Sequence, residues 1–206
     1  MARQAVALGI EVDIDRVLRG FRPTGQPDID LAELATLQDG IVDDMQLFAL
    51  RFGRDAIQWR VRSGRLHRIH PGVYAVGHHA LSLRARWRAG VMACGPGALL
   101  SHRDATQLWG LLRSNRSLIE VTVPTDRGRR VRGVQIHIAR RLMPQDRREC
   151  EGIPCVSVPM ALLNRAAVEP RRRVERACDE CEVQRLFDLR AIEELLARSR
   201  AASGQR

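Results

Sequence analysis

The spacing of the apolar residues changes character within the first third of the chain, and this change constrains the fold more than any other feature. Leu31–Leu37 and Met45–Leu50 have the apolar spacing of two short helices. A third helix is expected to begin at Arg54, with Ile57 and Val61 four positions apart as its buried pair. Three short helices in succession are therefore predicted for this stretch.

Capping residues support the boundaries of these helices. Asp28 or Asp30 can cap the first helix, and Gly40 can end it. Asp43 can cap the second helix, with Ile41-Val42 as a bridge between the two.

Two short extended runs follow the helices. Residues 66–69 and 73–76 read as strands, and Pro71-Gly72 between them is the signal of a type I or type II turn. A basic hairpin after three short helices is the outline of a winged helix-turn-helix. We therefore predict such a DNA-binding domain over residues 28–77, preceded by a lead-in over residues 1–27.

The third helix and the hairpin supply the predicted DNA contacts. With Ile57 and Val61 inward, the outward residues are Arg54, Asp55, Gln58 and Arg62. Arg can pair with guanine edges and Gln with adenine edges in the major groove. The hairpin adds residues that we expect to meet phosphate or the minor groove, namely Arg65, His67, Arg68 and His70. The alternative is a winged helix that serves protein contacts alone.

The charge distribution also favours a nucleic-acid partner. All 34 basic residues are Arg, and the net charge is −5 over residues 1–50, +14 over residues 51–150 and +1 over residues 151–206. In a soluble cytoplasmic protein, as expected here, a concentrated positive region indicates nucleic acid before any other partner. A GC-rich genome would explain Arg in place of Lys, but it would not explain the scarcity of acids in the middle of the chain.

The second half of the sequence reads as a mixed domain over residues 78–206. Helices are expected over Ala80–Met92 and from Ser101 to Leu112, and alternating residues predict strands at 119–123 and 134–138, joined by a basic loop at Arg127–Arg132. Three further helices are expected at 161–168, 171–185 and 189–197. The predicted fold class is therefore α+β.

Five segments, taken together, resemble the AbiEi family of antitoxins of the type with an N-terminal winged helix. In order they are SGRLHRIHPGVYAVG (Ser63–Gly77), SHRDATQLWGL (Ser101–Leu111), IEVTVP (Ile119–Pro124), VQIHIARRL (Val134–Leu142) and GIP (Gly152–Pro154). The resemblance runs from about Leu31 to Leu196. One departure is the stretch Val158–Asn164, where Met, Ala and Asn stand in place of the Arg, Thr and Asp of the usual Pro-Ala-Arg-Thr-Leu-Leu-Asp run.

The resemblance implies an antitoxin and autorepressor. Such a protein neutralises a nucleotidyltransferase-type toxin with its C-terminal domain and binds its own promoter, the operator DNA, through the winged helix. A stand-alone transcriptional regulator is an alternative. Longer proteins with this front half carry a restriction-like nuclease domain, and we expect no nuclease activity here because the chain contains no Lys.

A short motif raises the enzymatic alternative. His102-Arg103-Asp104 spells the start of a protein-kinase catalytic loop, but Trp109 stands where that loop has its magnesium-binding Asn. We interpret the segment as a helix N-terminus, with Ser101 as its cap and Asp104 favoured by the helix dipole. A kinase-like transfer of phosphate to the toxin, with ATP and Mg²⁺, remains the alternative, and Ser101–Asp104 would then be the first catalytic candidates.

No metal, cofactor or membrane partner is expected. Cys178 and Cys181 form a CxxC pair, but their spacing fits the buried face of a helix better than a zinc site. The five Cys are an odd number, which argues against a disulfide framework, and Gly90–Leu100 is too short and too rich in glycine to span a bilayer. We expect a cytoplasmic protein.

Overall fold

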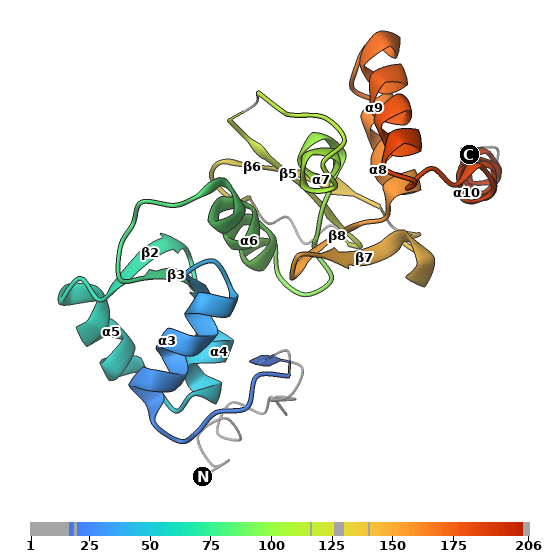
Figure 1. The fold of residues 1–206 in the computed structure, drawn as a ribbon. Helices are drawn as coiled ribbons and strands as arrows, with labels where there is room; N and C mark the ends of the chain where they lie inside the picture. Colours follow the sequence, from blue (N-terminus) through green and yellow to red (C-terminus); the bar gives the residue numbers. More distant parts are fainter. Residues whose placement is uncertain (1–16, 19, 116, 126–129, 140, 204–206) are drawn as a thin grey trace. The chain divides into compact units, whose positions relative to one another are not determined.

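The computed structural model describes residues 17, 18, 20–115, 117–125, 130–139 and 141–203, which combine helices with two sheets (Figure 1). The predicted α+β class is confirmed. The chain divides into two compact units, Met1–Ala93 and Cys94–Arg206, whereas the sequence suggested a boundary near Gly77. The lead-in predicted for residues 1–27 lies mostly outside the described residues, as does part of the loop predicted for Arg127–Arg132.

The first unit contains a three-stranded antiparallel sheet in the order β1-β3-β2. Its helices are α3 (Pro27–Leu37), α4 (Asp44–Ala49), α5 (Arg54–Arg62) and α6 (Leu83–Cys94), and its strands are β1 (Ile41–Asp43), β2 (Leu66–His70) and β3 (Val73–Val76). The hairpin predicted from the sequence is therefore present, and the predicted bridge at Ile41-Val42 is instead a strand. It becomes a strand because its residues pair with β3, with Ile41 opposite Ala75.

The two predicted helix caps have different outcomes. Asp43 caps α4 as expected. Its carboxylate accepts from the Gln46 backbone amide at 2.8 Å, and the Asp43 backbone amide donates to the side-chain oxygen of Gln46. Asp30 does not cap α3. That helix begins earlier, at Pro27, and Asp30 accepts instead from the amide and hydroxyl of Thr24, both at 2.7 Å.

An aliphatic core holds the first unit together. Leu31 of α3, Leu47 of α4 and Ile57 of α5 pack together in a single buried cluster. Leu37, which shares the predicted spacing of the first helix, is 68% exposed.

Ion pairs join helix α6 to this unit. Asp39 accepts from Arg84 and Arg88, with its two oxygens 3.0 Å and 2.8 Å from their nearest nitrogens. Burial works against ionisation of Asp39, but the two guanidinium groups lower its pKa below the usual value.

The second unit contains a five-stranded mixed sheet in the order β6-β5-β4-β8-β7. The strands are β4 (Leu99–Leu100), β5 (Ile119–Val123), β6 (Val134–Ile138), β7 (Arg147–Cys150) and β8 (Ile153–Val156). The helices are α7 (His102–Leu108), η1 (Pro144–Asp146, a 3₁₀ turn), α8 (Val158–Ala166), α9 (Arg171–Val183) and α10 (Leu189–Ser203). Strands β5 and β6 confirm the sequence prediction, whereas β4, β7 and β8 were not foreseen.

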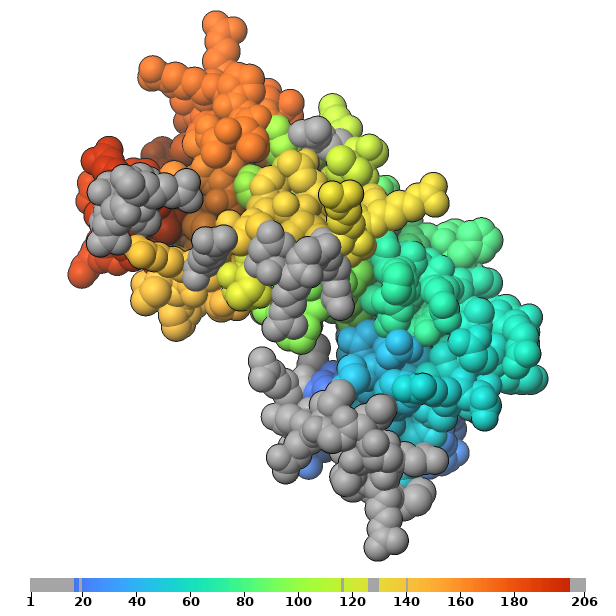
Figure 2. Space-filling model, turned by 180° about the vertical axis from the view of Figure 1, so that it is seen from behind, coloured from blue at the N-terminus to red at the C-terminus, as the bar shows by residue number. Residues whose placement is uncertain are grey.

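Helices α7 and α8 organise the second unit's interior. Helix α7 packs on β5 and on α8, and α8 in turn contacts α9 and α10. Ala177 and Cys181 of α9 are fully buried and Cys178 packs beside them, so the predicted core role of this CxxC pair is confirmed. In Figure 2, long side chains of the orange segment that includes α9 project from the surface. Within the described residues, no helix has both the length and the apolar character that a bilayer crossing requires.

Candidate nucleic-acid interface

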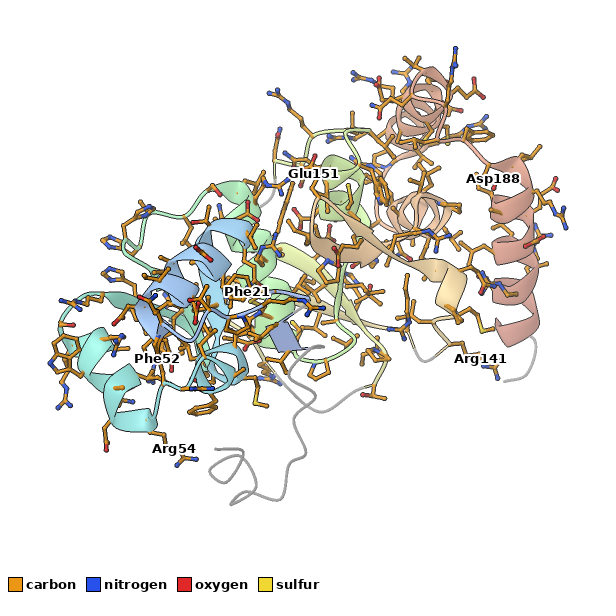
Figure 3. All side chains as sticks on the ribbon, turned by 60° about the horizontal axis from the view of Figure 1, so that its bottom comes forward. Phe21, Phe52, Arg54, Arg141, Glu151 and Asp188 are labelled. Carbon is orange, nitrogen blue, oxygen red and sulfur yellow. The ribbon has the colours of Figure 1, made fainter. Side chains whose placement is uncertain are left out.

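Helix α5 presents the predicted DNA-reading residues on an exposed face. The helix begins after Gly53 and ends before Ser63, and Ile57 anchors it with only 3% of its surface exposed. Arg54, Gln58 and Arg62 all lie on the solvent side. Figure 3 shows the labelled Arg54 pointing away from the start of the helix.

These three side chains have no partner in the described part of the chain, neither a hydrogen bond nor an ion pair. Arg60 on the same helix behaves differently. Its Nη2 lies 2.7 Å from Asp28 Oδ1, and its guanidinium lies 4.3 Å from the centre of the Phe52 ring. Arg60 therefore holds α5 against α3, while Arg54 and Arg62 keep their donors available for a ligand.

The turn before α5 carries another exposed arginine. Arg51 has φ +69°, and it follows α4 at the position where glycine is usual. Its amide donates to the Phe48 carbonyl at 2.9 Å and the Phe52 amide donates to the Leu47 carbonyl at 3.0 Å, which is the Schellman pattern. The chain thus retains a charged side chain where its backbone conformation favours glycine.

Trp59 is the residue of this face that the sequence interpretation missed. It is one of three tryptophans in the chain, and 49% of its surface is exposed. Successive helical residues are rotated by about 100°, so Trp59 falls opposite the Ile57 and Val61 pair, with Asp55 between it and Arg62. Applying that rotation to every residue of the predicted helix, instead of to its apolar pair alone, would have found it.

The predicted hairpin residues differ in what they offer. Arg65 is exposed, and its guanidinium lies 4.9 Å from the centre of the Trp59 ring. Arg68 is also exposed and lies 5.7 Å from the ring of Tyr74. His67 donates through Nε2–H to the Gly77 carbonyl at 3.2 Å, which leaves it less free to meet a ligand.

His70 is the weakest of the predicted contacts. Burial lowers its pKa, so the imidazole is neutral at pH 7 and brings no positive charge.

The hairpin turn beside His70 has type II geometry, since Gly72 has φ +74°. The Asp44 amide donates to the Gly72 carbonyl at 2.9 Å, which places the start of α4 and its acidic side chain against this turn. Positive charge on the hairpin is therefore concentrated at Arg65 and Arg68.

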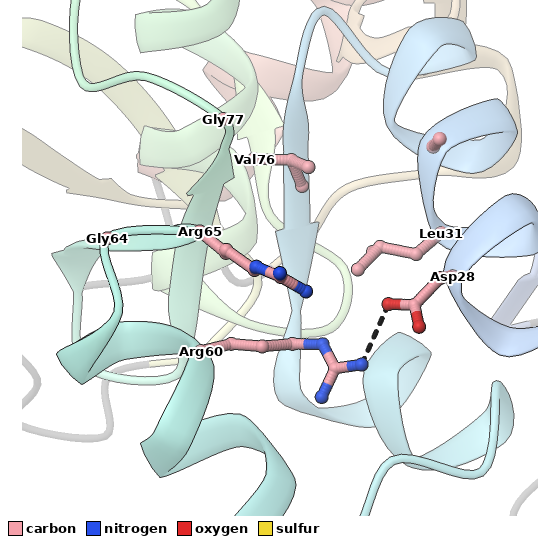
Figure 4. A pocket seen from close by; sticks show the side chains of 8 residues that line it. Asp28, Leu31, Arg60, Gly64, Arg65, Val76 and Gly77 are labelled. Carbon is pink, nitrogen blue, oxygen red and sulfur yellow. Dashed lines mark hydrogen bonds and ion pairs between the residues drawn. The ribbon is translucent and has the colours of Figure 1, made fainter.

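A shallow groove of about 290 Å³ adjoins the end of α5. Leu31 of α3 and Val76 of β3 provide apolar walls, and the side chains of Arg60 and Arg65 face the space between them (Figure 4). The dashed line in Figure 4 marks the pair between Arg60 and Asp28. Arg65 is therefore held between this groove and the Trp59 ring.

The other predicted cluster, in the second unit, is buried. Exposure is 0% for Ser101, 7% for His102, 8% for Arg103 and 4% for Asp104. Ser101 stands at the N-cap of α7, but its side chain makes no capping bond; its hydroxyl lies 3.0 Å from Nδ1 of His102. Asp104 accepts from the Glu120 amide at 2.7 Å. The predicted capping bond from Ser101 is thus wrong, since its hydroxyl is used by the neighbouring ring.

Glu120 of β5 is the centre of this cluster. One carboxylate oxygen accepts from the Arg103 amide at 3.0 Å and the other from Arg103 Nη1 at 2.9 Å. Burial would raise the pKa of Glu120, but interactions with His137 and with the Arg103 amide lower it below the usual value. The His137 Nε2 atom lies 3.6 Å from the carboxylate, which is too far for a well-formed hydrogen bond.

Arg103 also connects β5 to the end of α8. Its Nε donates to Glu169 at 2.5 Å and its Nη2 to the Val168 carbonyl at 2.7 Å. Arg165 is fully buried beside it, donates to the Thr106 hydroxyl and lies 3.9 Å from Glu169. These buried guanidinium groups therefore have carboxylate neighbours on the same network.

His102 occupies an unusual backbone conformation in this network. Its φ is +52°, and its ring is stacked on that of His137 with the two centres 3.6 Å apart. Burial, and then the neighbouring His137, lower the pKa of His102 to about 4. The ring is therefore neutral near pH 7.

The arrangement around Ser101–Asp104 supports a structural role. Its polar groups are turned towards one another, and Trp109, at the position of the kinase Asn, donates from Nε1 to the Val156 carbonyl at 3.0 Å. Among the residues that the structure describes, no group of three His, Cys, Asp or Glu side chains could hold a metal ion. By contrast, Arg54 and Arg62 of α5 and Arg65 and Arg68 near the hairpin are exposed. Comparison of the sequence with protein-family models and with curated proteins found no match.

Proposed function

We propose that the first unit is a winged helix-turn-helix domain that binds operator DNA, and that the chain is an antitoxin and autorepressor. Helices α3, α4 and α5 followed by the β2–β3 hairpin have the element order of such a domain, with α5 as the recognition helix. The observation that carries the proposal is the exposed, unpartnered row Arg54, Gln58 and Arg62. Bidentate donors in this arrangement suit base edges in the major groove.

Promoter binding by two single variants tests the DNA part. Arg54→Ala and Arg62→Ala should each lose about 1–3 kcal/mol of affinity for DNA from the chain's own promoter, if each reads a base. An arginine that contacts phosphate instead would reduce the slope of log affinity against log salt by about 0.9. Fluorescence anisotropy over a salt series measures both quantities.

Arg171→Ala is the matched control, because it removes the same charge from a side chain that is 91% exposed and far along the sequence, on α9. It should bind DNA like the wild type. Wild-type affinity in both Arg54→Ala and Arg62→Ala would show that α5 is not the recognition helix.

The toxin part of the proposal rests on the sequence segments that resemble the AbiEi antitoxins. We propose neutralisation by contact, since the kinase-like motif is buried and its groups are used internally. Native and intact-mass spectra of the chain co-expressed with its neighbouring gene product test this. A stoichiometric complex with unshifted masses would support contact, whereas a free toxin with the added mass of a phosphoryl group would contradict it. Promoter binding without any complex would favour a stand-alone regulator.

A further inference from the structure

Trp59 is the exposed one of three tryptophans. Trp87 is 4% exposed within α6, and Trp109 is partly buried with its indole N–H bonded to Val156. Trp59 has half of its surface in solvent, on a helix whose inward residue Ile57 is almost fully covered. Its ring is therefore not needed to fill the core of the first unit.

Arginines lie near the ring of Trp59, and Asp55 stands one turn earlier on the same face of α5. The guanidinium of Arg65 lies 4.9 Å from the ring centre, and that of Arg60 lies 5.8 Å from it. Three positions further along the helix, Arg62 lies on the same side and has no partner among the described residues. An apolar surface bordered by guanidinium groups, of which that of Arg60 is paired with Asp28, fits a ligand that carries both negative charge and apolar groups.

Double-stranded DNA has this combination in the major groove. Its phosphates attract arginine, and the C5-methyl group of thymine is an apolar feature at the base edge. We propose that Trp59 is a specificity-determining residue that contacts a thymine methyl group beside the bases read by Gln58 and Arg62. This inference rests on the proposed DNA binding by α5.

A protein partner is the competing explanation for an exposed tryptophan, since Trp and Arg are common in interface hot spots. The row of unpartnered donors on the same helix face favours DNA, because Arg54 and Gln58 continue that face towards the start of α5. A protein would have to supply acceptors along this whole row as well as a pocket for the ring.

Replacing thymine by uracil tests the contact directly, because uracil lacks only the C5-methyl group. A duplex is first selected from a random library with the wild-type chain. Each thymine is then replaced in turn by deoxyuridine. At one position we expect about a tenfold loss of wild-type affinity, the size of one good base contact. The Trp59→Ala variant should bind both duplexes equally, at the weaker affinity.

Further variants separate the possible causes. Trp59→Phe keeps an aromatic ring and should retain part of the preference for thymine. Leu37→Ala removes another exposed apolar side chain of the same unit, on α3, and should keep the full preference. Melting curves for all variants identify any that fail to fold. The duplex should also quench tryptophan fluorescence more in the wild type than in Trp59→Phe, because Trp87 is buried and Trp109 is partly buried with its indole N–H bonded to Val156.

The outcomes are distinguishable. If the wild type selects no duplex, the proposed DNA binding fails. If it selects one but tolerates uracil at every position, the role of Trp59 in base recognition is overturned while DNA binding stands. If Trp59→Ala weakens thymine and uracil duplexes equally, the ring acts by positioning Arg65 instead. Unchanged DNA affinity in Trp59→Ala, with loss of the complex with the co-expressed toxin, would assign the ring to a protein interface.

Discussion

Arginines are used in opposite ways on α5 and in the buried cluster of the second unit. On α5, Arg54 and Arg62 are exposed and have no partner among the described residues. In the second unit Arg103 and Arg165 are buried and lie beside carboxylates. The same side chain is thus a structural element where a carboxylate is supplied and a free donor where none is. In a chain without lysine, the positions of the acidic residues decide which arginines can serve a ligand.

Removing a buried arginine should have the largest effect on stability. Arg103→Ala leaves Glu120 and Glu169 without their main partner, and breaking a buried pair in this way costs about 3–5 kcal/mol of the free energy of unfolding. Chemical denaturation measures the loss. Arg54→Ala, in contrast, should stay within about 0.5 kcal/mol of the wild type. Equal midpoints for Arg103→Ala and the wild type would remove the contrast between the two units.

Lowering the pH should weaken the second unit next. The folded-state pKa of His102 is about 4, below the ordinary value of 6.5, so the unfolded chain binds more protons between these values. The free energy of unfolding should therefore fall as the pH drops from about 6.5, by up to about 3 kcal/mol at pH 4. Glu120 acts in the same direction at lower pH, because its folded pKa is also lowered and its stabilisation is lost on protonation.

His102→Asn isolates this effect. Asn tolerates the left-handed backbone at this position but does not titrate. Its unfolding free energy, measured between pH 7 and pH 4, should depend less on pH than that of the wild type. An unchanged pH dependence would assign it to other groups.

Arg51→Gly should have the smallest effect on stability, and it should change stability and DNA affinity in opposite directions. Glycine relieves the left-handed backbone, so the variant should be more stable by up to about 1 kcal/mol. The variant also loses a charge at the start of the proposed recognition helix, so its affinity for promoter DNA should fall. Thermal melting and anisotropy check the two signs. A variant that is more stable and binds equally well would show that Arg51 does not face DNA.

Features of the fold that depend on local sequence could be predicted. Helix α5 follows from the spacing of Ile57 and Val61, and the start of α4 follows from the reciprocal bonds of Asp43 and Gln46. Strands β1 and β4 could not be predicted, because two or three residues carry no periodic signal and their pairing depends on distant strands. The Asp28 or Asp30 cap was predicted wrongly, since local bonds to Thr24 compete with capping.

The candidate sites also divide into features set by local sequence and features set by distant residues. The exposed positions of Arg54, Gln58 and Arg62 follow from the spacing of one helix. The burial of Ser101–Asp104 does not, because the partners of Arg103 lie 17 and 66 residues away in sequence. A short motif that matches a catalytic loop therefore says little until the residues that surround it in space are known.

The ion pairs between Asp39 and α6 bear on where a fragment of the first unit should end. Asp39 itself has φ +53°, and its carboxylate accepts from Arg84 and Arg88. A fragment that ends at Gly77, after the last strand of the hairpin, would leave this carboxylate with neither guanidinium. A fragment that extends to Ala93 keeps both. A fragment designed to isolate the three-stranded sheet and its helices should therefore include α6.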